Sequence, residues 1–472
     1  MKHKSIGLNA IFNVINTASS IVFPLITYGH VARVLGIENI GKYNFAYTYV
    51  TYFQLIAALG ISTYAIREGA KYRENKEVLN KFVSQMLFIN LCATLVAYIL
   101  LFTFSFTNMI RPYSKIIFIL SFSIILTTAG CEWLFNIYED YGYITTRSIL
   151  FKIVALVLVL LLVKTKDDLM LYSWIMLLSG YGSNIINLLR INKYIDIVRI
   201  KISDIKIHLK PVFQIFVNTA AISIYVNSDT TILGFLASDY YVGLYSVAGK
   251  VYSIVKTMIA AVIIVSIPRL AMYINLEKKK FDELANNIFN ILLCIMMPAV
   301  TGLFVLSPNI ILILGGNEFM NAKTSLRILC IATLVSVIGW FYSSAILIPA
   351  KKEKKVLTAT VTAAIINVTL NFILIPIFYD KAAAVTTLLA EFVSMFMCVY
   401  YSHNIVSITV KKRDLFAISI GSFIVMAICV VISRNFRGMI VVPIAGVCSV
   451  TVYFGVLRIL KSSIFKRIKT VF

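Results

Sequence analysis

Long apolar segments recur along the whole chain and alternate with short polar ones. Each runs for roughly 20 residues, the length that an α-helix needs to cross about 30 Å of hydrocarbon. The pattern predicts fourteen membrane-spanning helices, at residues 8–29, 44–66, 82–104, 116–137, 147–163, 168–189, 212–236, 244–268, 284–306, 326–349, 356–378, 382–403, 415–432 and 438–459.

The composition agrees with this pattern. The 472 residues are 60% hydrophobic and only 14% charged, whereas soluble domains carry about 25% charged residues. The mean hydropathy is +0.87. We therefore expect an all-α polytopic membrane protein. The seven cysteines lie in apolar segments without a C-x-x-C pair, so we interpret them as packing residues rather than metal ligands.

The net charge of +23 is unevenly distributed. If the N-terminus is cytoplasmic, 30 of the 44 Lys and Arg fall in the cytoplasmic loops and tails, 11 fall on the outer side and three lie within spans. Cytoplasmic loops of membrane proteins carry an excess of Lys and Arg. The distribution predicts that both termini are cytoplasmic. The basic run KKEKK (351–355) is then a membrane anchor, and we expect no nucleic-acid partner.

An internal repeat predicts how the helices are grouped. Residues 41–67 align without gaps on residues 243–269, with six of 27 positions identical, among them Gly41 with Gly243. Repeats in parallel orientation build transporters from two lobes around a central cavity. We therefore predict two pseudo-symmetric six-helix lobes followed by two extra helices. The predicted parts are an N-lobe at 1–189, a cytoplasmic interfacial linker at 190–211, a C-lobe at 212–403, and the last two spans with a basic cytoplasmic tail at 404–472.

Polar residues are spaced along single helix faces in three spans. The first span carries asparagines at intervals of four and three residues, which share one face. Such stripes favour a wet cavity shared by the lobes. Interhelical hydrogen bonds, worth about 0.6 kcal/mol each, are the alternative interpretation. The residues selected as cavity-lining candidates are Asn9, Asn13, Asn16, Gln54 and Asn218.

Charged residues within or beside spans give a sharper indication. A charge near the bilayer centre costs roughly 2.5 to 3.5 kcal/mol on insertion scales, so it is expected to face a cavity or a partner. Fixed cations with few anions suit a phosphate or pyrophosphate ligand. For some of these cations, anchoring at the membrane interface is the alternative. The candidate lumen cations are Lys152, Lys250, Lys256, Arg33, Arg67, Arg147 and Arg269, and the candidate acids are Glu132, Asp229 and Glu391.

Several motifs resemble those of one transporter family. The segment EWLFNIYEDYGYITTRSILFKIV (132–154), followed by LVKTKDD (162–168), resembles the fourth-to-fifth span region of Wzx-type polysaccharide repeat-unit flippases of the MOP (multidrug/oligosaccharidyl-lipid/polysaccharide) superfamily. The resemblance covers essentially the whole chain. Its other motifs are ARVLG with GKY (32–43), LGISTYAIREGAKYR (59–73), SDTTILGF with VGLYSVAGK (228–250) and INVTLNFILIP (366–376).

The resemblance implies a function and a location. Such a protein moves an undecaprenyl-pyrophosphate-linked oligosaccharide from the cytoplasmic to the outer leaflet of the bacterial inner membrane, by alternating access through a cationic lumen. Lys152 would hold the pyrophosphate or acidic sugars, and Arg147 would steady the helix entrance. The three candidate acids would be counter-charges or carriers of H⁺ or Na⁺, with no other cofactor. In relatives of the lipid II flippase, an extra pair of helices forms a groove for the lipid tail. We expect a monomer that contacts membrane lipids and a polysaccharide polymerase.

Two other functions are weighed against this one. A membrane enzyme of glycan synthesis would need chemistry that the sequence lacks, since no P-loop, H-E-x-x-H or D-x-D motif is present and the four histidines have no acidic or cysteine partner at motif spacing. We therefore expect no enzymatic activity. A multidrug cation antiporter of the same superfamily is the second alternative, and a net acidic lumen would favour it.

Overall fold

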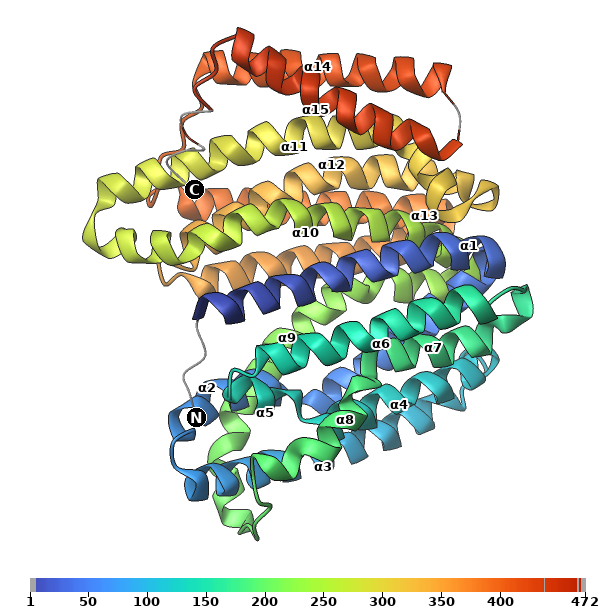
Figure 1. The fold of residues 1–472 in the computed structure, drawn as a ribbon, viewed down its shortest axis with the longest axis vertical. Coiled ribbons are helices and arrows are strands. Elements are labelled where there is room, and N and C mark those ends of the chain that lie inside the picture. Colours follow the sequence, from blue (N-terminus) through green and yellow to red (C-terminus); the bar gives the residue numbers. More distant parts are fainter. Residues whose placement is uncertain (1–5, 437, 465–466, 468–472) are drawn as a thin grey trace. The chain divides into compact units, whose positions relative to one another are not determined.

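Apolar helices make up nearly all of the structure, a computed structural model that describes residues 6–436, 438–464 and 467 (Figure 1). No strand occurs among these residues. The chain divides into two compact units, Met1–Thr231 and Ile232–Phe472. The longer helices are α1 (Ile6–Ala58), α2 (Ile61–Tyr72), α3 (Lys76–Ser105), α4 (Ser114–Gly130), α5 (Glu132–Ile137), α6 (Tyr141–Leu162), α7 (Leu169–Tyr181), α8 (Ser183–Arg190), α9 (Ile202–Leu236), α10 (Asp239–Leu276), α11 (Lys278–Gly315), α12 (Lys323–Trp340), α13 (Glu353–Ser402), α14 (Lys412–Asn435) and α15 (Val441–Ile459).

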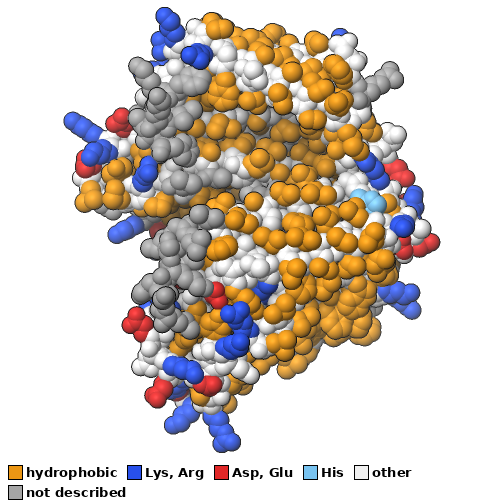
Figure 2. Space-filling model, in the orientation of Figure 1, with side chains coloured by type: hydrophobic (Ala, Val, Ile, Leu, Met, Phe, Trp, Pro, Cys, Tyr) orange, Lys and Arg blue, Asp and Glu red, His pale blue; other side chains and the backbone are white. Residues whose placement is uncertain are grey.

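Eleven helices of the described residues are long and apolar enough to cross a membrane, or twelve if one bent pair counts as a single span. The chain is therefore a multi-pass membrane protein. Hydrophobic side chains dominate the face drawn in Figure 2, and charged side chains gather toward the helix ends. This is the distribution that a hydrocarbon solvent selects.

Two of these helices are too long for one crossing. Helix α1 has 53 residues, or about 80 Å at 1.5 Å per residue. It breaks at Gly36, whose φ of 77° is left-handed and is readily adopted by glycine. Figure 1 shows the chain turning back within α1 before α2 begins. Helix α13 breaks likewise at Tyr379, with φ 53°, where the ring stacks on Tyr241 with centroids 4.1 Å apart. The fourteen predicted spans include two from each of these helices, separated at the observed breaks. The total of fourteen spans stays a prediction.

Two predicted spans end earlier than their apolar pattern suggests. The span predicted at 44–66 stops at Ala58, and the chain re-enters a helix at Ile61 after Gly60 with φ 74°. A Cβ at Gly60 would lie 2.8 Å from the backbone nitrogen of Phe216, so a side chain there would clash with α9. The span predicted at 116–137 breaks at Cys131, with φ 41°. Both predicted spans were too long because apolar residues continue after each break. These later residues pack against protein rather than against lipid.

The break at Gly36 has a counterpart in the second half of the repeat. The offset of 202 residues between the repeated segments places Gly36 opposite Ser238. Ser238 is the residue between α9 and α10 that precedes the first residue of α10, Asp239. Both copies therefore interrupt the helix at the equivalent position, five residues before the glycine of the G-x-Y motif.

The linker at 190–211 packs into unit 1. Ile195 and Ile205 belong to the same buried cluster as Leu79 and Phe82 of α3. Polar contacts add to this packing, since Asn80 accepts a hydrogen bond from the amide of Asp196 at 3.1 Å. The linker was predicted to lie along the cytoplasmic interface, and the structure shows which helix of unit 1 holds it.

Candidate functional site

Helix α6 carries two of the candidate cations, and the first is deeply buried. The Arg147 side chain is 4% exposed and donates to the Glu132 carboxylate at 2.6 Å, while that carboxylate is half exposed. A second guanidinium nitrogen donates to the carbonyl oxygen of Ser183 at 2.9 Å. A buried cation needs an anion and further acceptors to offset its lost hydration. Arg147 thus joins α5, α6 and α8. The Glu132 side chain that neutralises its charge is half exposed.

Aromatic rings surround the same guanidinium. Its central carbon lies 5.4 Å from the centroid of Tyr143 and 5.9 Å from that of Phe135. Arg190 approaches the Tyr143 ring at 4.1 Å. The negative faces of aromatic rings attract cations by about 0.5 to 2 kcal/mol each. These contacts hold the Arg147 guanidinium in place beside α5 and α6.

The second cation on α6, Lys152, has a different environment. Its ammonium donates to the hydroxyls of Ser19 at 3.0 Å and Ser20 at 2.8 Å, both on α1. These hydroxyls in turn donate to the carbonyl oxygen of Asn16. Lys152 forms no ion pair with any residue in the described part of the chain. Its ammonium is held by neutral oxygens, and the nearby Glu132 carboxylate acts on it electrostatically without forming an ion pair.

Unit 2 contains a compact ion pair in its first and fourth long helices. Lys256 on α10 donates to the Glu391 carboxylate on α13 at 2.8 Å. The Tyr252 hydroxyl, one turn before Lys256, donates to the same carboxylate oxygen at 2.8 Å. Glu391 is 10% exposed and Lys256 is 33% exposed. Glu391 is therefore already satisfied by a cation and a hydroxyl.

Lys250 lies on the same helix, between the Tyr245 and Tyr252 positions, and is half-buried. Within the ranges that the structure describes, its ammonium has no hydrogen-bond or ion-pair partner. A half-buried ammonium without an anion is costly. Lys250 and Lys152 thus share one property, an ammonium group that forms no ion pair with a carboxylate among the described residues.

The remaining candidates differ in their surroundings. Arg33, Arg67, Arg269 and Asn218 are exposed, and Arg67 contacts its neighbour Glu68 at 3.1 Å. Gln54 is used between helices, since it donates to Thr127 and accepts from Tyr181, as the interhelical alternative expects. Asp229 is buried on α9. The side chains of Asn9 and Asn13 lie outside the described residues.

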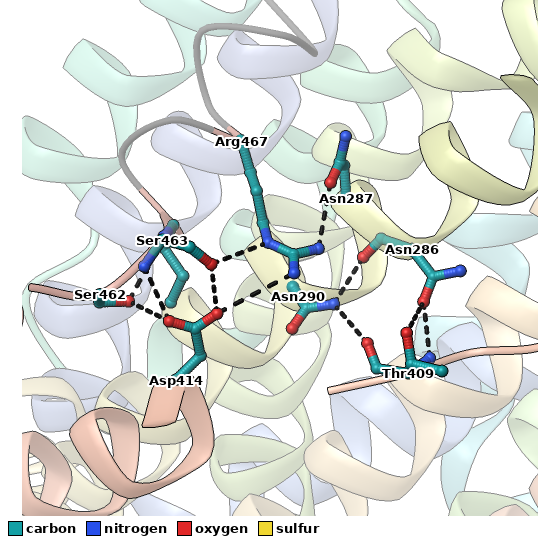
Figure 3. Close-up of polar contacts among 9 residues, drawn as sticks. Asn286, Asn287, Asn290, Thr409, Asp414, Ser462, Ser463 and Arg467 are labelled. Carbon is teal, nitrogen blue, oxygen red and sulfur yellow. Dashed lines mark hydrogen bonds and ion pairs between the residues drawn. The ribbon is translucent and has the colours of Figure 1, made fainter. Parts of the chain in front are cut away.

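A buried polar cluster at the C-terminal end was not anticipated (Figure 3). Asp414 at the start of α14 is fully buried and accepts hydrogen bonds from the Ser462 hydroxyl at 2.9 Å and the Ser463 amide at 2.8 Å. Arg467 lies beside it and donates to Asn287 of α11 at 3.0 Å. In the sequence, Asp414 directly follows the basic residues KKR (411–413), and nothing in this pattern indicates that the acid is buried. The cluster ties the segment after α15 to α11 and α14.

A second unanticipated contact involves the linker. His208 is buried, with Tyr64 at 2.8 Å from one ring nitrogen and Gln85 at 3.0 Å from the other. The sequence showed no acidic or cysteine partner for this histidine, and its neutral partners are consistent with a structural role. No group of three or more His, Cys, Asp or Glu suited to a metal ion occurs in the residues described.

The sequence and fold of this chain are similar to those of known proteins. The family model for "Polysaccharide biosynthesis protein" matches residues 6–274. The chain belongs to this family. A relative in Escherichia coli (strain K12), named "Putative O-antigen transporter", is 24% identical over 415 residues, which are 85% of this chain and 97% of that protein.

Solved structures show the same fold. A structure of the lipid II flippase MurJ in an inward closed conformation superposes with a TM-score of 0.73 at 17% identity, covering 97% of this chain and 99% of that one. An inward-facing multidrug resistance transporter of the MATE family and MOP superfamily gives 0.62 at 14% identity, covering 84% of this chain and 97% of that one. The predicted membership of a polysaccharide family is thus confirmed, and the two solved structures confirm the predicted helical transporter fold.

Proposed function

We propose that this protein is a lipid-linked oligosaccharide flippase. It moves undecaprenyl-pyrophosphate-linked polysaccharide repeat units from the cytoplasmic to the outer leaflet of the bacterial inner membrane, by alternating access through a cationic lumen. The family match, the relative named for O-antigen transport and the MurJ-like fold support this function. The relatives named here are transporters or flippases, and none is named as an enzyme.

The proposal rests on which charged side chains form ion pairs and which do not. Glu132 is paired with Arg147 and Glu391 with Lys256, whereas Lys152 and Lys250 have no carboxylate partner among the described residues. An anionic pyrophosphate gains from such free ammonium groups. A multidrug cation antiporter would need free acids instead, so these pairings weigh against that alternative.

A role in ion coupling follows for the Lys256 and Glu391 pair. Protonation of Glu391, or binding of Na⁺ there, would release the Lys256 ammonium 2.8 Å away. A released cation would attract the pyrophosphate, and re-formation of the pair would favour its departure. The lumen would thereby present one more free positive charge when the pyrophosphate is bound than when it is absent. The half-exposed carboxylate of Glu132 beside Arg147 is the second candidate carrier.

A lipid-tail path is available in unit 2. Helices α11, α14 and α15 enclose an apolar cavity of about 360 Å³, lined by residues such as Leu303, Val425 and Tyr453. This cavity fits the groove that the resemblance attributes to an extra pair of helices. We propose that part of the polyprenyl chain lies there, since its apolar walls match a hydrocarbon. The monomeric state, the polymerase partner and the cytoplasmic termini belong to the same proposal.

The test is export of surface glycan in a strain that lacks its own copy. Lys152→Ala and Lys250→Ala should each reduce surface polysaccharide at least tenfold at unchanged protein level in the membrane, and Lys152→Arg should retain more export because it keeps the charge. Lys164→Ala is the matched control, because this lysine is exposed beyond the end of α6. Normal export from both Lys152→Ala and Lys250→Ala would contradict the cationic lumen.

A further inference from the structure

A second cavity lies in unit 1, at the end of α3 and the start of α4. It has a volume of about 560 Å³ and is formed where α3 ends and α4 begins, with the short helix Arg111–Tyr113 between them. Its apolar wall includes Phe102, Phe106 and Phe118. These three side chains are 46%, 83% and 55% exposed. Exposed aromatic side chains at the end of a membrane-spanning helix offer an apolar surface against which a lipid chain packs favourably.

The polar side of the cavity is positively charged. Arg111 and Ser114 line it, and Lys115 follows one residue later. Residues 105–115 contain no Asp or Glu. The Arg111 guanidinium, the Ser114 hydroxyl and the Lys115 ammonium make no hydrogen bond or ion pair with any residue that the structure describes. Arg111 and Ser114 therefore offer two unused donors at the cavity itself, and the exposed Lys115 adds a positive charge one residue beyond Ser114.

The loop that carries these donors is held in place by packing. Ile110 is buried, and the Tyr113 amide donates to its carbonyl at 2.9 Å. The Tyr113 ring packs on Phe45 of α1 with centroids 4.7 Å apart. Because both residues are fixed against unit 1, the direction of the intervening backbone is set before any ligand arrives. The backbone that carries the donors is thus fixed before binding, which lowers the entropy lost when a ligand arrives.

We propose that this cavity binds the headgroup phosphate of an anionic membrane phospholipid, with the first carbons of an acyl chain against the phenylalanines. A guanidinium matches a phosphate in bidentate geometry, and the ammonium and hydroxyl can occupy its remaining oxygens. We choose a phospholipid as the occupant because the exposed phenylalanines lie next to the cationic side of the cavity. A phospholipid carries both an anionic phosphate and apolar acyl chains. By the predicted topology this end of α3 is on the outer side. The site is independent of the transport proposal.

The test uses the purified full-length protein in detergent and measures retained lipid by native mass spectrometry. Phosphatidylglycerol and phosphatidylcholine of equal chain length are added separately. The wild type should retain one phosphatidylglycerol in preference to phosphatidylcholine. Arg111→Gln should weaken this retention about tenfold, the equivalent of one charge-assisted hydrogen bond. Arg434→Gln, which removes an exposed arginine from the end of α14, should leave it unchanged.

A filling variant separates a cavity from a merely basic surface. Ser114→Trp keeps both cations and occupies the cavity, so it should lose phosphatidylglycerol as Arg111→Gln does, and Arg111→Lys should lose less. Retention by Ser114→Trp at the wild-type level would overturn the proposal, as would equal retention of the two lipids by the wild type. Displacement of phosphatidylglycerol by undecaprenyl phosphate at a lower concentration, dependent on Arg111, would also overturn it. Size-exclusion profiles verify that each variant is folded.

Discussion

Lys256 on α10 and Glu391 on α13 form an ion pair of 2.8 Å, although 135 residues separate them in the chain. The Tyr252 hydroxyl shares the same carboxylate oxygen. The pair occurs in the middle of apolar helices, where charged groups are stable only with a partner or in water. It joins two helices of unit 2 and leaves the Lys256 side chain one-third exposed.

The pair should behave as a coupled unit in a double-mutant cycle. Lys256→Ala should lower the free energy of unfolding by about 2 kcal/mol, less than for a fully buried pair because Lys256 is partly exposed. The double variant Lys256→Ala with Glu391→Ala should be more stable than Lys256→Ala alone, with a coupling energy of about 1 to 2 kcal/mol. Thermal unfolding in detergent measures this. Strictly additive effects would show that the ion pair makes no net contribution.

The buried acid of the C-terminal cluster should matter more than a surface acid. Asp414→Ala should destabilise the protein by about 2 to 3 kcal/mol because it leaves the Ser463 amide and its neighbours without an acceptor, while Asp414→Asn should cost less. The control is Asp282→Ala on α11, whose pair with Lys278 is more exposed and should contribute about 0 to 1 kcal/mol. Equal melting temperatures for the two alanine variants would contradict this ranking.

The linker should loosen in acid. A hydrogen bond and the charge of Lys76, 2.9 Å away, lower the pKa of Asp196 from its usual 3.8. A carboxyl with a lowered pKa stabilises the fold above its unfolded value, and this contribution is lost as the pH falls through the folded value. The protection factors of the amides of residues 194–198, which compare each measured exchange rate with the unprotected rate at the same pH, should therefore fall below about pH 4 and stay constant between pH 5 and 7. Hydrogen exchange followed by mass spectrometry detects the step, and Asp196→Asn should lack it.

The predicted topology can be tested by labelling single cysteines in a background without the native ones. The structure exposes Asn317, Lys354 and Lys412, so burial cannot block the reagent. A cysteine at Asn317 should react with a membrane-impermeant thiol reagent in intact cells, because the charge distribution places it outside. Cysteines at Lys354 and Lys412 should react only after the membrane is opened. The reverse pattern would contradict cytoplasmic termini.

Much of this architecture is already determined by the order of residues. Apolar length and the placement of Lys and Arg predict a multi-pass helical protein because insertion into lipid depends on local composition. The free-energy cost of a charged side chain within a membrane span also identified Lys152, Lys250, Lys256 and Glu391 as candidate functional residues. The break between the first two helices has a sequence basis as well, since Gly36 tolerates the left-handed backbone.

Only the tertiary structure decided which charges are paired and which are free. Glu391 could have met any nearby cation, and helix packing selected Lys256, whereas Lys152 met two serine hydroxyls of α1 instead of an acid. The ends of two spans were also decided this way, because Gly60 and Cys131 break helices whose apolar residues continue into protein contacts. Sequence reports the cost of a residue in lipid, but a partner from a distant helix depends on packing, which has no local signal.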